Sequence, residues 1–329
     1  MNILITGGTG FIGSRLALGR LEKGDFVRVL GQVNTEAEAE NRRLIESGGA
    51  QLLLGSVTER EKVTEAVKDM DVVFHLAAAQ HEANVPDQRF WDVNVTGTKN
   101  LLEASIQAGV KRFVHGSTIG VYGSAQKGML DEESSLKPDN IYGVTKREAE
   151  KAVLSFKDKI PLVIIRISET YGPGDRRLLK LFKAIKKKAF FMIGKGENWH
   201  HPIYIDDLIL GLTLAATSEN AVGRVFVLAG KEPLTTRQMV LEIAGALGTS
   251  VTPFRAPLGP FVILAAAMET LLRPIGIQPP LHRRRLDFFR KSFSFSLNES
   301  SQRLGFVPQY SFRQGVEKTI QWYSEIGAM

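Results

Sequence analysis

Two side chains one helical turn apart, the phenol of Tyr142 and the ammonium of Lys146, have a spacing that suits acid–base chemistry. They belong to the run 140–150, which is predicted to open a helix, where residues four apart share a face. A nearby cation favours a phenolate, so Lys146 is expected to lower the pKa of Tyr142 from its usual value of about 10. Such a phenol could exchange a proton with a substrate oxygen near neutral pH. Alone, the pair also fits a solvated helix surface, so its interpretation depends on the elements that come before it.

A glycine loop near the start of the chain has the context of a dinucleotide site. An apolar strand at 2–6 leads into Gly7, Gly10 and Gly13, and a helix is predicted over 14–23. Gly7 permits the tight turn, Gly10 lets the backbone approach a pyrophosphate, and Gly13 allows close packing of helix on strand. Free N–H groups and the helix dipole favour an anion there. The loop therefore predicts a bound NAD or NADP.

The end of the second strand leaves the choice between NAD and NADP open. That strand, 26–30, is followed by Gly31 and Gln32. Neither the acid that holds a ribose hydroxyl nor an arginine for a 2′-phosphate stands there. Arg15 and Arg28 are cations that could reach such a phosphate, although solvated side chains are the simpler expectation.

Helices alternating with short apolar strands predict the architecture of this half. Such alternation favours a parallel sheet with right-handed crossovers, an α/β fold of the Rossmann type that is doubly wound. The expected elements are helices at 35–47, 58–67 and 92–108 and strands at 51–54, 71–76 and 110–115. Ser117 and Thr118 come at the carboxyl end of the last strand, where open α/β sheets bind ligands. A hydroxyl there could bond a substrate oxygen or simply its own backbone.

Composition restricts the classes of protein. The 329 residues are 43% hydrophobic and 23% charged and contain no cysteine, which excludes disulfides and thiolate chemistry. The start of the chain lacks the features of a signal peptide, and no apolar run is as long as a membrane span, so a cytoplasmic protein is expected. The net charge of +7 comes without a nucleic-acid-binding motif, and no metal-ligand spacing is present. No nucleic acid and no metal are therefore expected.

Motifs in a fixed order along the chain give a resemblance to a known family. The chain resembles the extended short-chain dehydrogenase/reductase family, also called the NAD-dependent epimerase/dehydratase family. The matching segments are 7–13, 75–78, Asn94 with 97–98, 117–118 ahead of 121–123, Tyr142 with Lys146, 171–175, 204–207 and 305–308.

The resemblance implies a role for each matched residue. Tyr142 would be the acid/base, Lys146 would also hold the nicotinamide ribose, and Thr118 would orient the reacting oxygen. Thr118 is preferred to Ser117 because it stands four positions before Tyr122, as the catalytic Ser/Thr of the family does. The implied cofactor-binding residues are Gly7, Gly10, Phe11, Ile12, Gly13, Gln32, Ser56, Val57, Leu76, Ala77, Ala78, Asn94 and Lys146. Ser117, Glu169 and His200 fall at substrate-binding positions.

Departures from the family pattern bear on the substrate. Ser56 replaces the aspartate that meets the adenine in many members, and Ile119 replaces an acid of the dehydratases. Nucleotide-sugar enzymes usually carry Asn where Glu169 stands, and commonly an Arg on the diphosphate where His200 stands. A carboxylate would repel a diphosphate, and histidine is a weaker partner than a bidentate arginine.

The C-terminal half is expected to form a smaller, partly interleaved substrate domain. The expected division is 1–167 with 203–228 for the nucleotide-binding domain, and 168–202 with 229–329 for the smaller one. A helix ending in three lysines is predicted over 175–188. An apolar stretch at 257–272 precedes a basic cluster at 282–285. The segment is expected to cover the substrate pocket, and contact with a membrane surface through 257–285 is the less simple alternative.

Three functions remain open. The first is hydride transfer between nicotinamide and a secondary alcohol or ketone without a nucleotide, resembling the 3β-hydroxysteroid-dehydrogenase and dihydroflavonol-reductase branch. The second is a nucleotide-sugar 4-epimerase using the same Thr118, Tyr142 and Lys146. The third is a non-catalytic, cofactor-sensing binding protein, which could dispense with the Tyr/Lys pair that this chain keeps. A homodimer through helices near 94–108 and 142–156 is expected from the resemblance.

Overall fold

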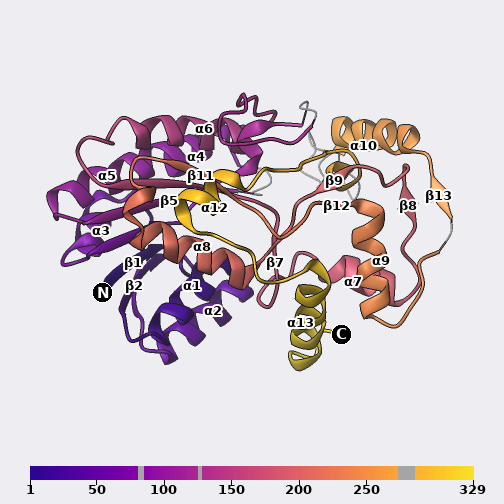
Figure 1. The fold of residues 1–329 in the computed structure, drawn as a ribbon, viewed down its shortest axis with the longest axis horizontal. Coiled ribbons are helices and arrows are strands. Elements are labelled where there is room, and N and C mark those ends of the chain that lie inside the picture. Colours follow the sequence, from indigo (N-terminus) through magenta and orange to yellow (C-terminus); the bar gives the residue numbers. More distant parts are fainter. Residues whose placement is uncertain (81–84, 125–127, 253, 273–285) are drawn as a thin grey trace.

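A parallel sheet forms the centre of the larger part of the molecule (Figure 1). The computed structural model describes residues 1–80, 85–124, 128–252, 254–272 and 286–329. Seven strands make the sheet: β1 (Asn2–Thr6), β2 (Phe26–Gly31), β3 (Gln51–Leu54), β4 (Val72–His75), β5 (Arg112–Thr118), β6 (Leu162–Ile167) and β11 (Val225–Leu228). Their order is β11-β6-β5-β4-β1-β2-β3, and every neighbouring pair is parallel. The predicted Rossmann-type sheet is confirmed.

Helices cover both faces of this sheet because successive strand residues point to opposite sides. Ile3 and Ile5 pack in one hydrophobic cluster with residues of the first helix and the eighth, whereas Leu4 packs in another with the third and fifth. The helices of this part are α1 (Phe11–Leu21), α2 (Glu36–Ser47), α3 (Arg60–Val67), α4 (Asp87–Trp91), α5 (Gly97–Gln107), α6 (Ile141–Leu154), α8 (Ile205–Thr217) and α12 (Asn298–Leu304). A π-helical turn (Asp92–Thr96) joins α4 to α5, and 3₁₀ turns lie at Ile119–Tyr122 and Glu219–Ala221.

Several predicted helices have different bounds in the structure: the one expected over 14–23 runs from Phe11 to Leu21, and three others differ as follows. The expected helix over 92–108 is interrupted by the π-helical turn, a feature that often marks functional sites. The helix expected from Thr58 begins at Arg60, because the Thr58 hydroxyl donates to Ser56 instead of capping it. The helix expected over 175–188 is confined to α7 (Leu179–Lys186), since the Asp175 carboxylate folds the preceding residues into a turn.

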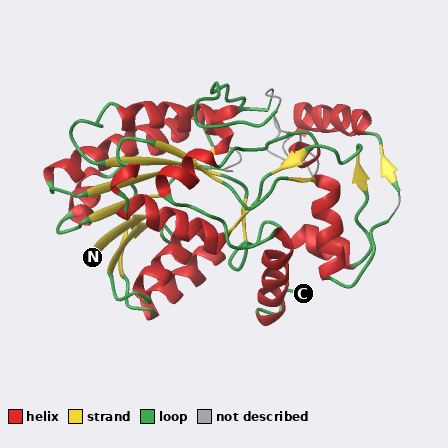
Figure 2. Cartoon of the chain, in the orientation of Figure 1, coloured by secondary structure: helices red, strands yellow, loops and turns green. Residues whose placement is uncertain are grey.

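The smaller part of the molecule carries short strands and the remaining helices (Figure 2). Its strand pairs are β7 (Thr170–Tyr171) with β10 (Ile203–Tyr204), β8 (Met192–Ile193) with β13 (Arg255–Ala256), and β9 (Trp199–His200) with β12 (Leu234–Thr235). The helices are α9 (Thr236–Ala246), α10 (Leu258–Leu272) and α13 (Phe312–Glu325), with a 3₁₀ turn at Asp287–Phe289. β11 joins the main sheet, and Leu304 and Phe306 also lie in its core. The domain division itself stays a prediction.

Candidate active site

The glycine loop after β1 has the shape that an anion cradle needs. Gly7 has a φ of +70°, and a Cβ there would lie 2.8 Å from the backbone nitrogen of Ala77. A Cβ on Gly13 would lie 2.4 Å from the Gly7 carbonyl oxygen, so this glycine lets α1 approach the loop. A Cβ on Gly10 would meet only that carbonyl within 4 Å, which leaves its outer side open.

The N-terminus of α1 supplies donors to the same place. Gly10 is the N-cap and carries no side-chain cap. Within the described residues, the backbone N–H groups of Phe11, Ile12 and Gly13 have no hydrogen-bond partner. Three free donors and the positive end of a helix dipole suit a pyrophosphate. The loop therefore fits the dinucleotide predicted from the sequence.

The other predicted cofactor residues lie along the carboxyl edge of the sheet. Leu76, Ala77 and Ala78 follow β4, next to Gly7, and are partly accessible. Ser56, after β3, lines a cavity of about 430 Å³ together with Asp92 and other residues of the α4 region. Gln32 is exposed after β2, and its carbonyl oxygen accepts a hydrogen bond from Thr9, whereas Val57 is buried against Gly97.

The two cations considered for a 2′-phosphate differ in how firmly the protein holds them. The Arg28 guanidinium donates to Gln51 and to the carbonyl oxygens of Ala66 and Lys68, which tie it to the end of α3. Arg28 is thus bonded to the protein, and the expectation of a solvated side chain is wrong. The guanidinium of Arg15 lies 3.8 Å from the Asp206 carboxylate.

Asn94 braces the site from within the π-helical turn. Its side-chain oxygen accepts from the backbone N–H of Ala79, and its amide donates to the Ala79 carbonyl and to the Thr145 hydroxyl. The side chain is buried and all these partners belong to the protein. Asn94 therefore joins the loop after β4 to helix α6, which places it beside the predicted cofactor residues as a positioning residue.

Thr118 and Tyr142, 24 positions apart in the sequence, meet where β5 ends and α6 begins. The Asn140 side chain caps α6 by accepting from the Gly143 N–H at 3.0 Å, so Tyr142 lies in the first turn. A Cβ on Gly143 would lie 2.6 Å from the Gly120 carbonyl oxygen, and this glycine therefore allows the helix to approach the turn after β5. The Thr118 hydroxyl lies close enough to the half-buried Tyr142 phenol to lower its pKa.

The pKa of Tyr142 moves in the direction opposite to that expected. Burial raises it to about 12, since the Thr118 hydroxyl and the Arg177 charge lower it by less than burial raises it. Lys146 is not among the groups that shift it, and the Lys146 Nζ donates instead to the Gly116 carbonyl oxygen at 2.6 Å. In the protein alone, the prediction that Lys146 depresses this pKa is therefore wrong.

Lys146 is buried between α6 and β5. Its polar neighbours there were not identified by sequence reasoning. Burial lowers its pKa to about 8, against the attraction of Glu150. The His115 Nε2 lies 3.5 Å from the Lys146 Nζ, and among the described residues the buried His115 Nδ1 has no partner. Burial and the Lys146 charge hold the pKa of His115 well below its usual range. The two groups in contact with the Lys146 ammonium, the Gly116 carbonyl and the His115 ring, are thus neutral, and the Glu150 charge acts on it from farther away.

Ser117 points away from Thr118 and takes part in a buried ion pair. Its hydroxyl donates to Glu150 at 2.5 Å, and Arg166 Nη2 lies 2.9 Å from the same carboxylate. Both charged side chains are almost fully buried, and Arg166 also donates to the Tyr122 hydroxyl. Ser117 is therefore bound within the protein, which leaves Thr118 as the hydroxyl beside Tyr142. Glu150 follows Tyr142 and Lys146 at intervals of four, a signal that sequence reasoning missed.

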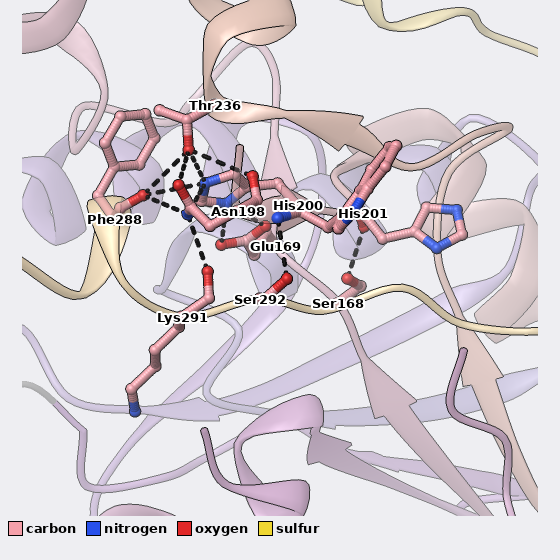
Figure 3. A network of polar contacts seen from close by, with 10 residues as sticks. Ser168, Glu169, Asn198, His200, His201, Thr236, Phe288, Lys291 and Ser292 are labelled. Carbon is pink, nitrogen blue, oxygen red and sulfur yellow. Dashed lines mark hydrogen bonds and ion pairs between the residues drawn. The ribbon is translucent and has the colours of Figure 1, made fainter. Parts of the chain in front are cut away.

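Glu169 and His200, two separate departures in the sequence, form one pair in the structure (Figure 3). The His200 Nδ1 lies 3.0 Å from both carboxylate oxygens of Glu169. Its Nε2 contacts the Thr236 hydroxyl and the Phe288 carbonyl oxygen. Burial lowers the pKa of His200, but the Glu169 charge and hydrogen bond more than offset this, and the net direction is upward. His200 is buried, whereas 40% of the Glu169 side chain is exposed.

Arg177 is a cation whose charge acts on Tyr142 and that sequence reasoning did not select. Its guanidinium bonds the Asp175 carboxylate at 2.8 Å and the Thr170 carbonyl oxygen at 2.7 Å, and it lies 5.7 Å from the centre of the Phe11 ring. The side chain remains 56% exposed. Its position two residues after the matched segment 171–175 was the available signal. Among the described residues, no group of three His, Asp or Glu side chains could hold a metal ion.

Comparison with known proteins places the chain among enzymes with this architecture. It is 27% identical over 304 residues to 3beta-hydroxysteroid-dehydrogenase/decarboxylase isoform 2 of Arabidopsis thaliana, covering 86% of this chain and 54% of that protein. The chain thus spans about half the length of that relative. It is 26% identical to N-acetyl-alpha-D-glucosaminyl-diphospho-ditrans,octacis-undecaprenol 4-epimerase of Escherichia coli O157:H7, covering 98% and 95% of the two chains.

A solved structure and a family model extend the comparison. The crystal structure of UDP-glucuronic acid 4-epimerase from Bacillus cereus in complex with NAD has a TM-score of 0.81 to this chain, with 25% identity and 99% of each chain covered. The model of the NAD dependent epimerase/dehydratase family matches residues 3–229, from the first strand of the sheet to its last. The chain belongs to the NAD-dependent epimerase/dehydratase family and is an enzyme of the extended short-chain dehydrogenase/reductase type.

Proposed function

We propose that this enzyme is an oxidoreductase that exchanges hydride between NAD(P) and a secondary alcohol or ketone without a nucleotide. The observation that carries the chemistry is the approach of the Thr118 hydroxyl to the Tyr142 phenol at the carboxyl edge of the sheet, beside a glycine loop with free N–H donors. NAD(P), when bound, supplies or accepts the hydride.

The chain's own residues would move the proton. Tyr142 gives its phenolic proton to the oxygen of a reduced carbonyl, or takes one from an alcohol, and Thr118 holds that oxygen. Because burial raises the pKa of Tyr142 to about 12, the phenol is protonated in the protein alone and ready for reduction. The exposed Arg177 charge lowers that pKa and would help to stabilise the phenolate left behind.

The pair of Glu169 and His200 supports a substrate without a diphosphate. The Glu169 carboxylate is partly exposed, and a negative charge there repels phosphate. Both ring nitrogens of His200 already have partners in the protein, so no N–H of this residue is left to bind a diphosphate. A neutral ketone or alcohol avoids this repulsion.

A 4-epimerase is the second candidate, and the similarity to the E. coli epimerase over nearly the whole chain favours it. Both reactions would use Thr118, Tyr142 and Lys146, but they differ in redox balance. A net oxidoreductase accumulates reduced or oxidised cofactor, whereas an epimerase returns its cofactor to the starting state.

A substrate panel tests the proposal. Purified protein is incubated with NAD⁺ or NADP⁺ and sterols, hydroxyketones or nucleotide sugars, and the absorbance of reduced nicotinamide is followed. We expect the parent protein to reduce NAD⁺ or NADP⁺ when a nucleotide-free alcohol is present. The Tyr142→Phe variant should not produce reduced cofactor. Epimerised nucleotide sugar without net reduction would reject the first candidate in favour of the second. The same panel decides between NAD and NADP.

We also propose a cytoplasmic homodimer formed through α5 and α6, as the family resemblance implies. The two helices pack beside one another on the sheet, with Ile106 and Leu154 only partly buried at their outer ends. Sedimentation of the purified protein at micromolar concentration should give twice the mass of one chain, and a monomer would contradict the proposal.

A further inference from the structure

Helix α10 presents an apolar stripe to solvent. Ile263 and Leu271 are 72% and 71% exposed, and Leu264 between them is also exposed. With Pro260 and Ala267 they recur every three or four residues, the spacing of one helix face. Thr270 is the one polar side chain on the exposed part of the helix, and Glu269 is buried. Contiguous exposed apolar surface of this kind marks an interaction site.

The stripe continues into exposed aromatic residues at the base of the helix. Phe254 is 60% exposed, and its ring centre lies 5.9 Å from that of Phe191, which is itself exposed. The Phe191 ring lies 6.2 Å from that of Phe261 in α10. These rings connect β8, β13 and α10, which Figure 1 shows at the end of the molecule remote from α1 and α2.

A cationic cavity adjoins this apolar surface. It holds about 210 Å³ between β8, α9 and β13 and is lined by Met192, Lys195, Arg237, Val240, Leu241, Val251, Thr252 and Arg255. The lining residues thus include four apolar side chains and three cations, and none of them is acidic. All three cationic residues, Lys195, Arg237 and Arg255, are exposed. In the part of the chain that the structure describes, their side chains form no ion pair and no hydrogen bond.

More positive charge lies beside the cavity. Lys186 ends α7 and is followed by Lys187 and Lys188, and the Thr252 hydroxyl donates to the Lys188 carbonyl oxygen at 3.1 Å. The segment 179–195 contains six lysines and no acid. Paired charges would suit a stable protein surface, whereas a set of unpaired cations around an apolar surface is complementary to a partner that is both anionic and apolar.

We propose that α10, Phe254 and the cationic cavity form a docking surface for an anionic lipid bilayer. The apolar face of α10 would enter the boundary between headgroups and acyl chains, and the cavity would receive a headgroup phosphate. No helix among the described residues is long and apolar enough to cross a membrane, so the contact would be at the surface. The basic cluster at 282–285 lies outside the described residues and carries no part of the argument.

Cosedimentation with vesicles tests this proposal. The full chain is mixed with vesicles of phosphatidylglycerol and phosphatidylcholine, or of phosphatidylcholine alone, at low and at physiological salt. The protein should pellet with the anionic vesicles and dissociate as salt rises. Ile263→Glu with Leu271→Glu should weaken binding about tenfold or more, and Arg255→Glu about tenfold, because each change removes apolar or electrostatic attraction.

Matched changes elsewhere control for nonspecific effects. Val307→Glu alters an exposed apolar side chain, and Lys23→Glu reverses an exposed cation, both outside the docking surface. These controls should bind vesicles like the parent protein, and circular dichroism should show all variants folded. Turnover on a water-soluble substrate should be unchanged throughout, so a failure here is distinct from a failure of the proposed oxidoreductase activity.

Three outcomes would overturn the proposal. The first is parent-like binding by the Glu variants of α10 and Arg255. The second is binding to inorganic phosphate or glycerol phosphate without vesicle binding, which would indicate a soluble anion as the ligand. The third is loss of self-association in sedimentation on Ile263→Glu without any effect on vesicles, which would assign the stripe to a second copy of the chain.

Discussion

Two clusters of charged side chains, one in each part of the molecule, show opposite arrangements. In the sheet part, Arg166 and Glu150 are nearly fully buried, and Ser117 completes their hydrogen bonds. In the smaller part, Arg237 and Arg255 line a cavity and are exposed. Burial of paired groups fixes β5 and α6, which carry Thr118 and Tyr142, whereas unpaired surface charge is left for partners. The proposed chemistry and the proposed bilayer contact would thereby be separated in space.

Gly10→Val should produce the largest effect, because a side chain there occupies the space that the pyrophosphate needs. We expect the folded variant to lose NAD(P) binding, measured by calorimetry. Gly19→Ala in the same helix is the matched control, since a Cβ there would meet only the Ile209 side chain, at 3.8 Å. Unchanged cofactor affinity in Gly10→Val would remove the assignment of the sheet part as the cofactor site.

Tyr142→Phe should cost about 10²–10⁴-fold in turnover, the usual contribution of general acid–base catalysis. The change deletes the transferable proton and keeps the ring packing, so cofactor binding should persist. Tyr122→Phe is the matched control: this hydroxyl binds Arg166 and the Asp131 carbonyl, and its loss should affect stability more than turnover. Turnover of Tyr142→Phe within about threefold of the parent, with chemistry rate-limiting, would reject Tyr142 as the acid/base.

Glu150→Gln should show how strongly the sheet part depends on buried pairing. It leaves Arg166 buried beside an amide, and breaking a buried ion pair costs about 3–5 kcal/mol of unfolding free energy. Because the Glu150 charge raises the pKa of Lys146, the variant should also lower that pKa further below about 8. Urea unfolding measures the first effect. A loss of stability no larger than that of a surface substitution would contradict the contrast between the two parts.

Local sequence patterns predicted the sheet part well because its determinants are local. Apolar strands alternating with helices specify the parallel sheet, and the spacing of Gly7, Gly10 and Gly13 specifies the cradle. The alternation of side chains along β5 could also have separated Ser117 from Thr118 without a structure, since neighbours in a strand face opposite sides.

Burial and long-range pairing could not be predicted in the same way. The spacing of Tyr142 and Lys146 indicates a shared helix face, but it does not show that the ammonium turns to the Gly116 carbonyl or that burial raises the tyrosine pKa. Glu169 and His200 were considered as two independent departures because 31 positions separate them. Their pairing depends on how β9 and the end of β6 are placed by the tertiary fold.

The smallest predicted effect tests whether Glu169, in the substrate region, acts on the neighbouring His200. The pKa of His200 is raised above its unfolded value, so its pairing stabilises the fold below pH 6.5 and is lost as pH rises through the folded pKa. Glu169→Gln removes the attraction and leaves burial, which lowers the pKa, so His200 should become neutral near pH 7.

His201 provides an internal reference, because burial lowers its pKa to about 4 although it is the next residue. Proton NMR titration should show that His200 stays protonated to a higher pH than His201 in the parent. In Glu169→Gln the difference between the two pKa values should narrow, while the pKa of His201 changes little. A His200 titration that does not respond to the change would mean that Glu169 does not set its charge. The argument that this pair repels a diphosphate would then rest on the Glu169 carboxylate alone.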